Sequence, residues 1–222
     1  MSLFRLDASI RVEGSNSRAI ADLVEAEWRA RHPHGDVTRR HVGTEPLPAD
    51  AWALAMSAST TPLESQSRAQ VTAAALATTL VDELLAADAF LVAVPLYNFG
   101  VSQHFKTWVD LVLTDPRMKE TDPLPLAGRP AVLVVARGGA YGAGTPREGW
   151  DHATGWIRRI LEDVWQLDLR VVETEFTLVG VNPALDPFKD MAAQMRRDAE
   201  VLAAAHGTFL GAASARDFEG VR

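Results

Sequence analysis

Apolar positions along this chain alternate between two spacings. Short, nearly unbroken apolar runs are typical of strands that a parallel sheet buries on both faces. Longer segments with apolar residues three and four positions apart are typical of helices. The predicted strands are residues 3–8, 36–42, 89–94, 131–136 and 169–176. The predicted helices are residues 17–31, 67–87, 105–112, 156–164 and 191–202, with Ser17 as the N-cap of the first.

This alternation of strands and helices predicts an α/β fold in which a parallel sheet lies between two layers of helices. Five strands favour the order 2-1-3-4-5 of a flavodoxin-like three-layer sandwich over a six-stranded dinucleotide-binding fold. Residues 43–65 are a functional loop, a pair of short helices or a mobile segment, and residues 114–129 are a second long loop. We expect a single domain over residues 1–211 and a polar tail over residues 212–222.

Composition and charge narrow the classes of function. A net charge of −7 argues against a nucleic-acid-binding protein, which would present a basic face. The chain has no cysteine, which excludes disulfides, thiolate metal sites and thiol catalysis. The six histidines form no metal-binding motif, so no metal is expected. We expect no membrane span and no secretory signal, and the absence of cysteine favours the reducing cytoplasm.

The first of three loops with unusual composition follows the first predicted strand. It contains Ser9, Ser15, Asn16 and Ser17 and leads directly into a helix. Hydroxyl groups and free amides at a helix N-terminus suit an anion such as a phosphate. The Gly-Lys-Ser/Thr ending of a P-loop is missing, which disfavours a nucleoside triphosphate held with Mg²⁺. The alternative is an ordinary helix cap followed by a polar turn.

The other two loops follow the third and fourth predicted strands, so all three meet at one edge of the sheet. Pro95-Leu96-Tyr97-Asn98-Phe99-Gly100 offers aromatic rings and backbone amides that suit a planar heterocycle. Arg137-Gly138-Gly139-Ala140-Tyr141 contains paired glycines, which allow a ligand to approach the backbone closely. Each loop alone could be a packed or flexible turn. Three such loops at one edge favour a ligand site.

At these loops the sequence resembles the family of FMN-dependent NADH:quinone oxidoreductases and azoreductases. The matching segments are Ser9 to Ser17, Pro95 to Phe99 with Phe105-Lys106-x-Trp108-x-Asp110, and Arg137-Gly138-Gly139 with Tyr141. The resemblance spans nearly the whole chain. It implies one tightly bound FMN per subunit, a homodimer, and two-electron transfer from NADH or NADPH to a quinone or azo compound.

The resemblance also implies roles for individual residues. Ser9, Ser15, Asn16 and Ser17 would hold the FMN phosphate, and Leu96, Tyr97, Asn98 and Phe99 would border the flavin ring. Ala136, Arg137, Gly138 and Gly139 would follow the pyrimidine edge of the ring, where the two glycine amides are candidate donors to the reduced flavin. Tyr141 would either donate a hydrogen bond or a proton, or only form a wall of the site.

Donor and acceptor would react in turn at one place, in a ping-pong mechanism. Two departures from the family concern contacts of the site: Ala136 stands where some members have serine, and residues 114–118 lack the aromatic run often found near the substrate.

Two other functions stay open, an NAD(P)H:flavin reductase and a flavodoxin-type electron carrier without enzymatic activity. A phosphoacceptor receiver domain is disfavoured, because Pro95 stands where an aspartate would end the third strand.

Overall fold

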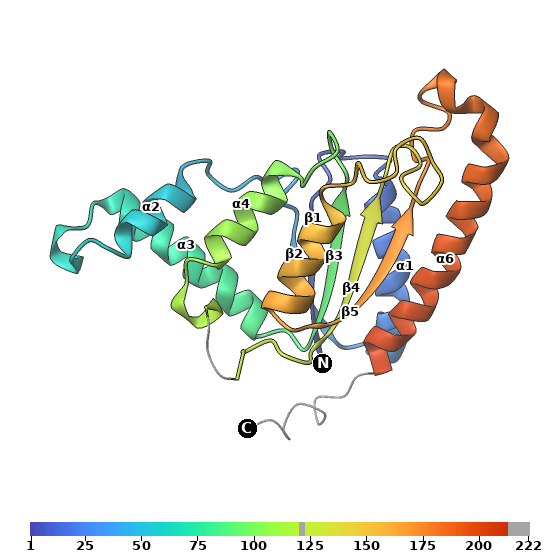
Figure 1. Ribbon diagram of the computed structural model, residues 1–222. Coiled ribbons are helices and arrows are strands. Elements are labelled where there is room, and N and C mark those ends of the chain that lie inside the picture. Colours follow the sequence, from blue (N-terminus) through green and yellow to red (C-terminus); the bar gives the residue numbers. More distant parts are fainter. Residues whose placement is uncertain (120–122, 213–222) are drawn as a thin grey trace.

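The computed structural model describes residues 1–119 and 123–212. Its centre is a five-stranded, fully parallel sheet with the order β2-β1-β3-β4-β5, which confirms the predicted topology (Figure 1). The strands are β1 (Ser2–Asp7), β2 (Asp36–Arg40), β3 (Ala89–Pro95), β4 (Pro130–Ala136) and β5 (Asp168–Thr174). Strands β3 and β4 are buried at every position, as their unbroken apolar sequences predict.

Helices cover both faces of the sheet (Figure 1). The α-helices are α1 (Asn16–Arg31), α2 (Ala51–Ala58), α3 (Arg68–Leu85), α4 (Gln103–Val112), α5 (Thr154–Arg158) and α6 (Lys189–Ala212). The shorter helical segments are η1 (Leu63–Ser65), η2 (Pro116–Met118), η3 (Arg159–Val164) and η4 (Pro183–Phe188). One apolar layer is shared by α1, α6 and the sheet, and the other is shared by α3, α4, α5 and the opposite face.

Several element boundaries differ from the predicted ones. Ser15, and not Ser17, caps α1, because its backbone is extended and its side chain accepts a hydrogen bond from the amide of Arg18. The predicted loop 43–65 contains the short helices α2 and η1. The predicted fourth helix is α-helical only in α5 and continues as the π-helical η3. Ala212 ends α6, and the rest of the predicted tail lies outside the described residues.

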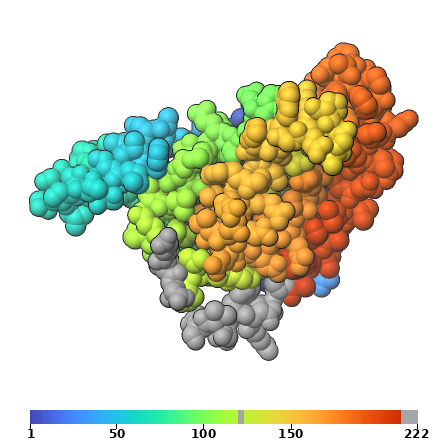
Figure 2. Space-filling model, in the orientation of Figure 1, coloured from blue at the N-terminus to red at the C-terminus, as the bar shows by residue number. Residues whose placement is uncertain are grey.

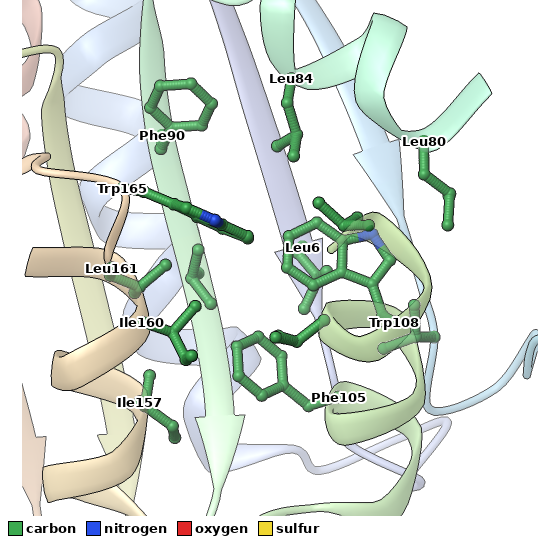
Figure 3. Packing of buried hydrophobic residues seen from close by; sticks show 14 of the residues in the cluster. Leu6, Leu80, Leu84, Phe90, Phe105, Trp108, Ile157, Ile160, Leu161 and Trp165 are labelled. Carbon is green, nitrogen blue, oxygen red and sulfur yellow. The ribbon is translucent and has the colours of Figure 1, made fainter. Parts of the chain in front are cut away.

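Aromatic packing fixes α4 against the sheet (Figure 3). Trp108 is fully buried, stacks on Phe4 of β1 with a ring-centroid distance of 5.9 Å, and meets Trp165 edge-on at 5.6 Å. Phe105 lies one helical turn earlier and packs against the same indole at 5.7 Å. Such pairs add to the area-dependent stabilisation of the core. The start of α4, and with it the end of the loop after β3, is therefore held in one place.

On the opposite face of β1, two charged side chains follow the apolar Leu3. Arg5 and Asp7 are almost fully buried and lie 3.1 Å apart, and Arg5 also reaches Glu25 of α1 at 2.9 Å. Glu25 receives further ion pairs from Arg29 and Arg39. Burial alone would raise the pKa of Glu25, but the hydrogen bonds from its arginine partners lower it below the ordinary value. The network fixes α1 against β1, just below the loop that joins them.

Residues 51–71 form a projection from the body of the molecule, which is defined here as the arm (Figures 1 and 2). It contains α2 and η1, and α2 packs against α3. Large apolar side chains are exposed on it, namely Trp52, Met56, Leu63 and Val71. An exposed apolar surface of this kind is typical of a protein contact.

Replacing Glu25 with glutamine tests the buried charge network. We expect E25Q to lower the free energy of unfolding at pH 7 by about 1.5–3 kcal/mol, the range for lost hydrogen bonds to charged groups. Because the pKa of Glu25 is depressed in the folded state, its stabilisation is complete above the unfolded value of about 4.3 and disappears as the pH falls through the lower folded value. Denaturant titrations at several pH values should therefore show the difference from the wild type shrinking on acidification.

The matched control is Glu162→Gln, which removes an exposed partner of Arg158. It should cost less than about 1 kcal/mol. Equal losses in the two variants, or a difference for E25Q that does not change with pH, would contradict the role given to the network.

Candidate functional site

The carboxyl ends of β1, β3 and β4 open into a cavity of about 120 Å³. The cavity is lined by Ser9, Arg11, Ser15, Asn16, Ser17, Pro95, Leu96, Tyr97, Ala136, Gly138, Thr177 and Leu178. The lining comes from all three loops singled out in the sequence and from the loop after β5. It contains hydroxyl groups, amides and one guanidinium, and no carboxylate. The structure thus brings together eight of the twelve predicted cofactor-binding residues, and the other four lie within two residues of them in the chain.

Hydrogen-bond donors converge on the cavity at the N-terminus of α1. Ser15 and Ser17 are buried, with their hydroxyl oxygens 3.4 Å apart. Within the described part of the chain, the amide N–H groups of Asn16 and Ser17 have no acceptor, as expected for the first turn of a helix. Arg11 lines the same cavity and forms no ion pair with any described residue. These groups together suit a bound anion.

The side chain of Asn16 joins elements that are distant in the sequence. Its amide nitrogen donates to the carbonyl of Thr177 at 3.4 Å, and its carbonyl oxygen accepts from Arg196 of α6 at 3.2 Å. The side chain of Asn16 is therefore occupied by protein partners and fixes the start of α1 against the loop after β5. Only the backbone N–H group of Asn16 is available for the predicted contact with a ligand.

The loop after β3 makes a tight turn. Asn98 and Phe99 have φ angles of 49° and 65°, and Tyr97 pairs with Gly100 across them. Two consecutive residues with positive φ define a type I′ turn, in which a phenylalanine is unusual and strained. The phenol oxygen of Tyr97 accepts from the amide of Ile10 at 3.2 Å and lies 3.5 Å from the Ser9 hydroxyl, which ties this loop to the first one.

The backbone of the glycine loop is oriented by the loop after β5. The carbonyls of Arg137, Gly138 and Gly139 accept hydrogen bonds from the amides of Thr177, Leu178 and Phe176. The amides of the two glycines have no acceptor among residues 1–119 and 123–212. A Cβ atom at Gly138 would lie 2.7 Å from Cδ1 of Leu178, so any larger residue there would have to displace the Leu178 side chain.

Arg137 is buried, and its side chain lies among three carboxylates, of which Glu175 is buried and Glu173 is exposed. Its guanidinium lies 2.8 Å from Asp151, 2.6 Å from Glu173 and 3.2 Å from Glu175. Burial would lower the pKa of Arg137, but these carboxylates raise it above the ordinary value. Glu175 also accepts from the amide of Tyr141 at 2.9 Å. The side chain of Arg137 therefore positions the glycine loop, and its backbone N–H and carbonyl groups bond to Thr174 and Thr177.

Next to the cavity lies a group of side chains defined here as the rim cluster: Phe99, Tyr141, Arg147 and Trp150. Phe99 is 6.3 Å from Tyr141 and 5.5 Å from Trp150, measured between ring centroids. Arg147 donates to the hydroxyl oxygen of Tyr141 at 3.3 Å. Tyr141 is thus half-buried beside Phe99, where a flat ligand would reach it.

Sequence reasoning missed several residues that the structure places at or beside the cavity. Thr177 and Leu178 follow the last strand and could have been included, because the carboxyl end of β5 lies at the same edge of the sheet. Arg11 lies within the first loop but was left out of the anion site. Arg147 lies in a segment without a motif, and nothing in the sequence places it beside Phe99.

The donor set determines which ligands fit. Unpaired amides, serine hydroxyls and Arg11 favour a phosphate or similar anion, and the adjoining aromatic side chains favour a planar group linked to it. Among the described residues, no group of three or more histidine, aspartate or glutamate side chains could hold a metal ion. No helix in that part of the chain is long and apolar enough to cross a membrane.

Comparisons with known proteins agree with this geometry. Residues 1–199 match a protein family described as having a flavodoxin-like fold. An FMN-dependent NADH:quinone oxidoreductase from Frankia alni is 40% identical over 201 residues, which cover 90% of this chain and 95% of the relative.

Solved structures show the same fold. An azoreductase from Bacillus anthracis has a TM-score of 0.75 and 19% identity, covering 94% of this chain and 99% of its own. An FMN-dependent NADH-azoreductase from the same species, in complex with FMN, has a TM-score of 0.67 and 13% identity, covering 91% of this chain and all of its own.

Replacing Arg137 with methionine tests its positioning role. Because the buried Glu175 and the partly buried Asp151 would be left without their cation, we expect R137M to lower the free energy of unfolding by about 3–5 kcal/mol. The amide of Tyr141 should also exchange its hydrogen faster, measured by hydrogen–deuterium exchange. Glu173 is 44% exposed, so the control E173Q should cost less than about 1 kcal/mol. An R137M variant with native stability and unchanged exchange at Tyr141 would rule this role out.

Proposed function

This chain belongs to the FMN-dependent NADH:quinone oxidoreductases, a family with the flavodoxin-like fold, and on that premise we propose that it binds FMN and reduces quinones or azo compounds with hydride from NADH or NADPH. The observation that carries the proposal is the convergence of unpaired donors on a cavity without carboxylates, next to an exposed aromatic cluster. Relatives named for this activity, such as that from Frankia alni, support it over nearly the full chain.

The phosphate end of FMN would lie in the cavity at the start of α1. Ser9, Ser15 and Ser17 supply hydroxyl groups there, and Arg11 supplies a positive charge that no described carboxylate neutralises. Each hydrogen bond to a charged group is worth about 1.5–3 kcal/mol, so a few of them suffice to retain a phosphate.

The ring end would lie against the second and third loops. Leu96 and Tyr97 line the cavity next to the Asn98–Phe99 turn, and Ala136 and Gly138 line it from the other side. The unpaired amides of Gly138 and Gly139 can donate to the pyrimidine edge of the ring, where negative charge develops on reduction.

When bound, FMN supplies the two-electron chemistry, in which hydride is accepted from a nicotinamide and passed to a quinone or azo compound. The residues of the chain position the reactants. Phe99 and Tyr141 form a surface on which donor and acceptor would bind in turn, in the order of a ping-pong mechanism. Tyr141, with its hydroxyl held by Arg147, would orient the acceptor or supply a proton to it.

A homodimer in the cytoplasm completes the proposal. The exposed apolar side chains of the arm, Trp52, Met56 and Leu63, support contact with a second copy of the chain. A chain without cysteines is compatible with a reducing compartment.

The two half-reactions provide the test of activity. Purified protein loaded with FMN should bleach on anaerobic addition of NADH or NADPH and regain its visible spectrum on addition of a quinone. Tightly held FMN that neither nucleotide bleaches would identify an electron carrier reduced by a partner instead. Flavin that is reduced but released at each turnover would identify a flavin reductase. A chain that takes up no flavin would contradict the proposal.

Replacing Arg11 with glutamine or Ser17 with alanine tests the placement of the phosphate. We expect each substitution to weaken FMN binding by about 10- to 100-fold, the equivalent of one lost hydrogen bond to a charged group. Riboflavin lacks the phosphate and should bind both variants as it binds the wild type. Fluorescence titrations with the two flavins measure the dissociation constant of each for the variants and the wild type. If FMN and riboflavin lost affinity equally, the phosphate would lie elsewhere.

A further inference from the structure

We propose that Arg147 determines substrate specificity by binding an anionic group of the electron donor or acceptor at the rim cluster. The inference rests on the proposed function and goes beyond it, because it assigns a charge preference to the place where the two substrates react. The anionic group would be a phosphate of the nicotinamide nucleotide or an acidic substituent of the acceptor, such as a sulfonate.

The guanidinium of Arg147 is held over two aromatic rings. Its central carbon lies 5.8 Å from the ring centroid of Phe99 and 5.7 Å from that of Tyr141. It also donates a hydrogen bond to the Tyr141 hydroxyl at 3.3 Å. Cation–π contacts of this kind orient a guanidinium without neutralising its charge. The side chain is therefore positioned beside the proposed flavin site in advance of any ligand.

The charge of Arg147 is free to meet a ligand. The residue is exposed, and it forms no ion pair with the described residues, unlike the arginines of α5 and η3, which pair with acids one turn away. The neighbouring carboxylate of Glu148 accepts instead from the amide of Gly144 at 2.8 Å. A ligand would not have to displace a protein carboxylate.

An anion is the ligand chemistry that fits this arrangement. A guanidinium binds phosphate or sulfonate oxygens through two parallel hydrogen bonds. The chain as a whole carries a net charge of −7 and repels anions at long range. A local unpaired arginine offsets this repulsion at the point of entry, next to the aromatic surface on which a flat substrate would stack.

The test uses full-length protein loaded with FMN and three variants. R147Q removes the charge, R147K keeps the charge but not the planar fork, and R159Q removes an exposed arginine that pairs with Asp163. One arm measures, by calorimetry, the Kd of a tetrahydro analogue of NADH that cannot donate hydride. The other arm measures KM and kcat for ortho-naphthoquinone and for its sulfonate.

If Arg147 binds the donor, R147Q should raise the Kd of the analogue by about 10- to 100-fold. If it binds the acceptor, R147Q should raise the KM of the sulfonated quinone by that factor and leave the KM of the neutral quinone unchanged. In either case R147K should be intermediate and R159Q should behave as the wild type. Wild-type values for R147Q in both arms would overturn the role assigned to Arg147 and leave the proposed function of the protein standing. Wild-type protein that takes up no FMN would overturn the proposed function together with it.

Discussion

The site depends on the register in which three parallel strands end. Asp7 of β1 pairs with Ala93 of β3, and Pro95 at the end of β3 pairs with Ala136 at the end of β4. Because these strands stop at nearly the same level, their loops have to leave the sheet side by side. A shift of one residue would turn every side chain of a strand to the opposite face, which buried strands cannot tolerate. The register of the buried strands thus sets the position of the loops at the edge of the sheet.

Two networks of charged side chains then hold the backbone of those loops in position. Arg5 joins β1 to α1 through Asp7 and Glu25, and so fixes the start of α1 where the serines converge. Arg137 joins the glycine loop to β5 and to the segment before α5. Ion pairs at such depth contribute little net stability compared with apolar packing, but they are costly to break. Here the ion pairs hold the loops in position. The backbone amides of these loops are directed at the cavity and have no acceptor among the described residues.

The sequence was sufficient to predict the sheet order, the layers and the three loops, because unbroken apolar runs and helical spacing are local signals. It also indicated most of the cavity lining, since ligands bind at the carboxyl ends of parallel strands. The cap of α1 was predicted at Ser17 and lies at Ser15, because two nearby serines offer equivalent caps and only the backbone angles decide between them. The buried partners of Arg137 and the placement of Arg147 over Phe99 arise from contacts between distant segments, which no periodicity encodes.

The most direct test of the central claim is a crystal structure of this chain with FMN. We expect the phosphate within hydrogen-bond distance of Ser15, Ser17 and the first amides of α1, with the ring between the Asn98–Phe99 turn and the amides of Gly138 and Gly139. A phosphate bound away from the start of α1, or a ring that contacts neither loop, would contradict it.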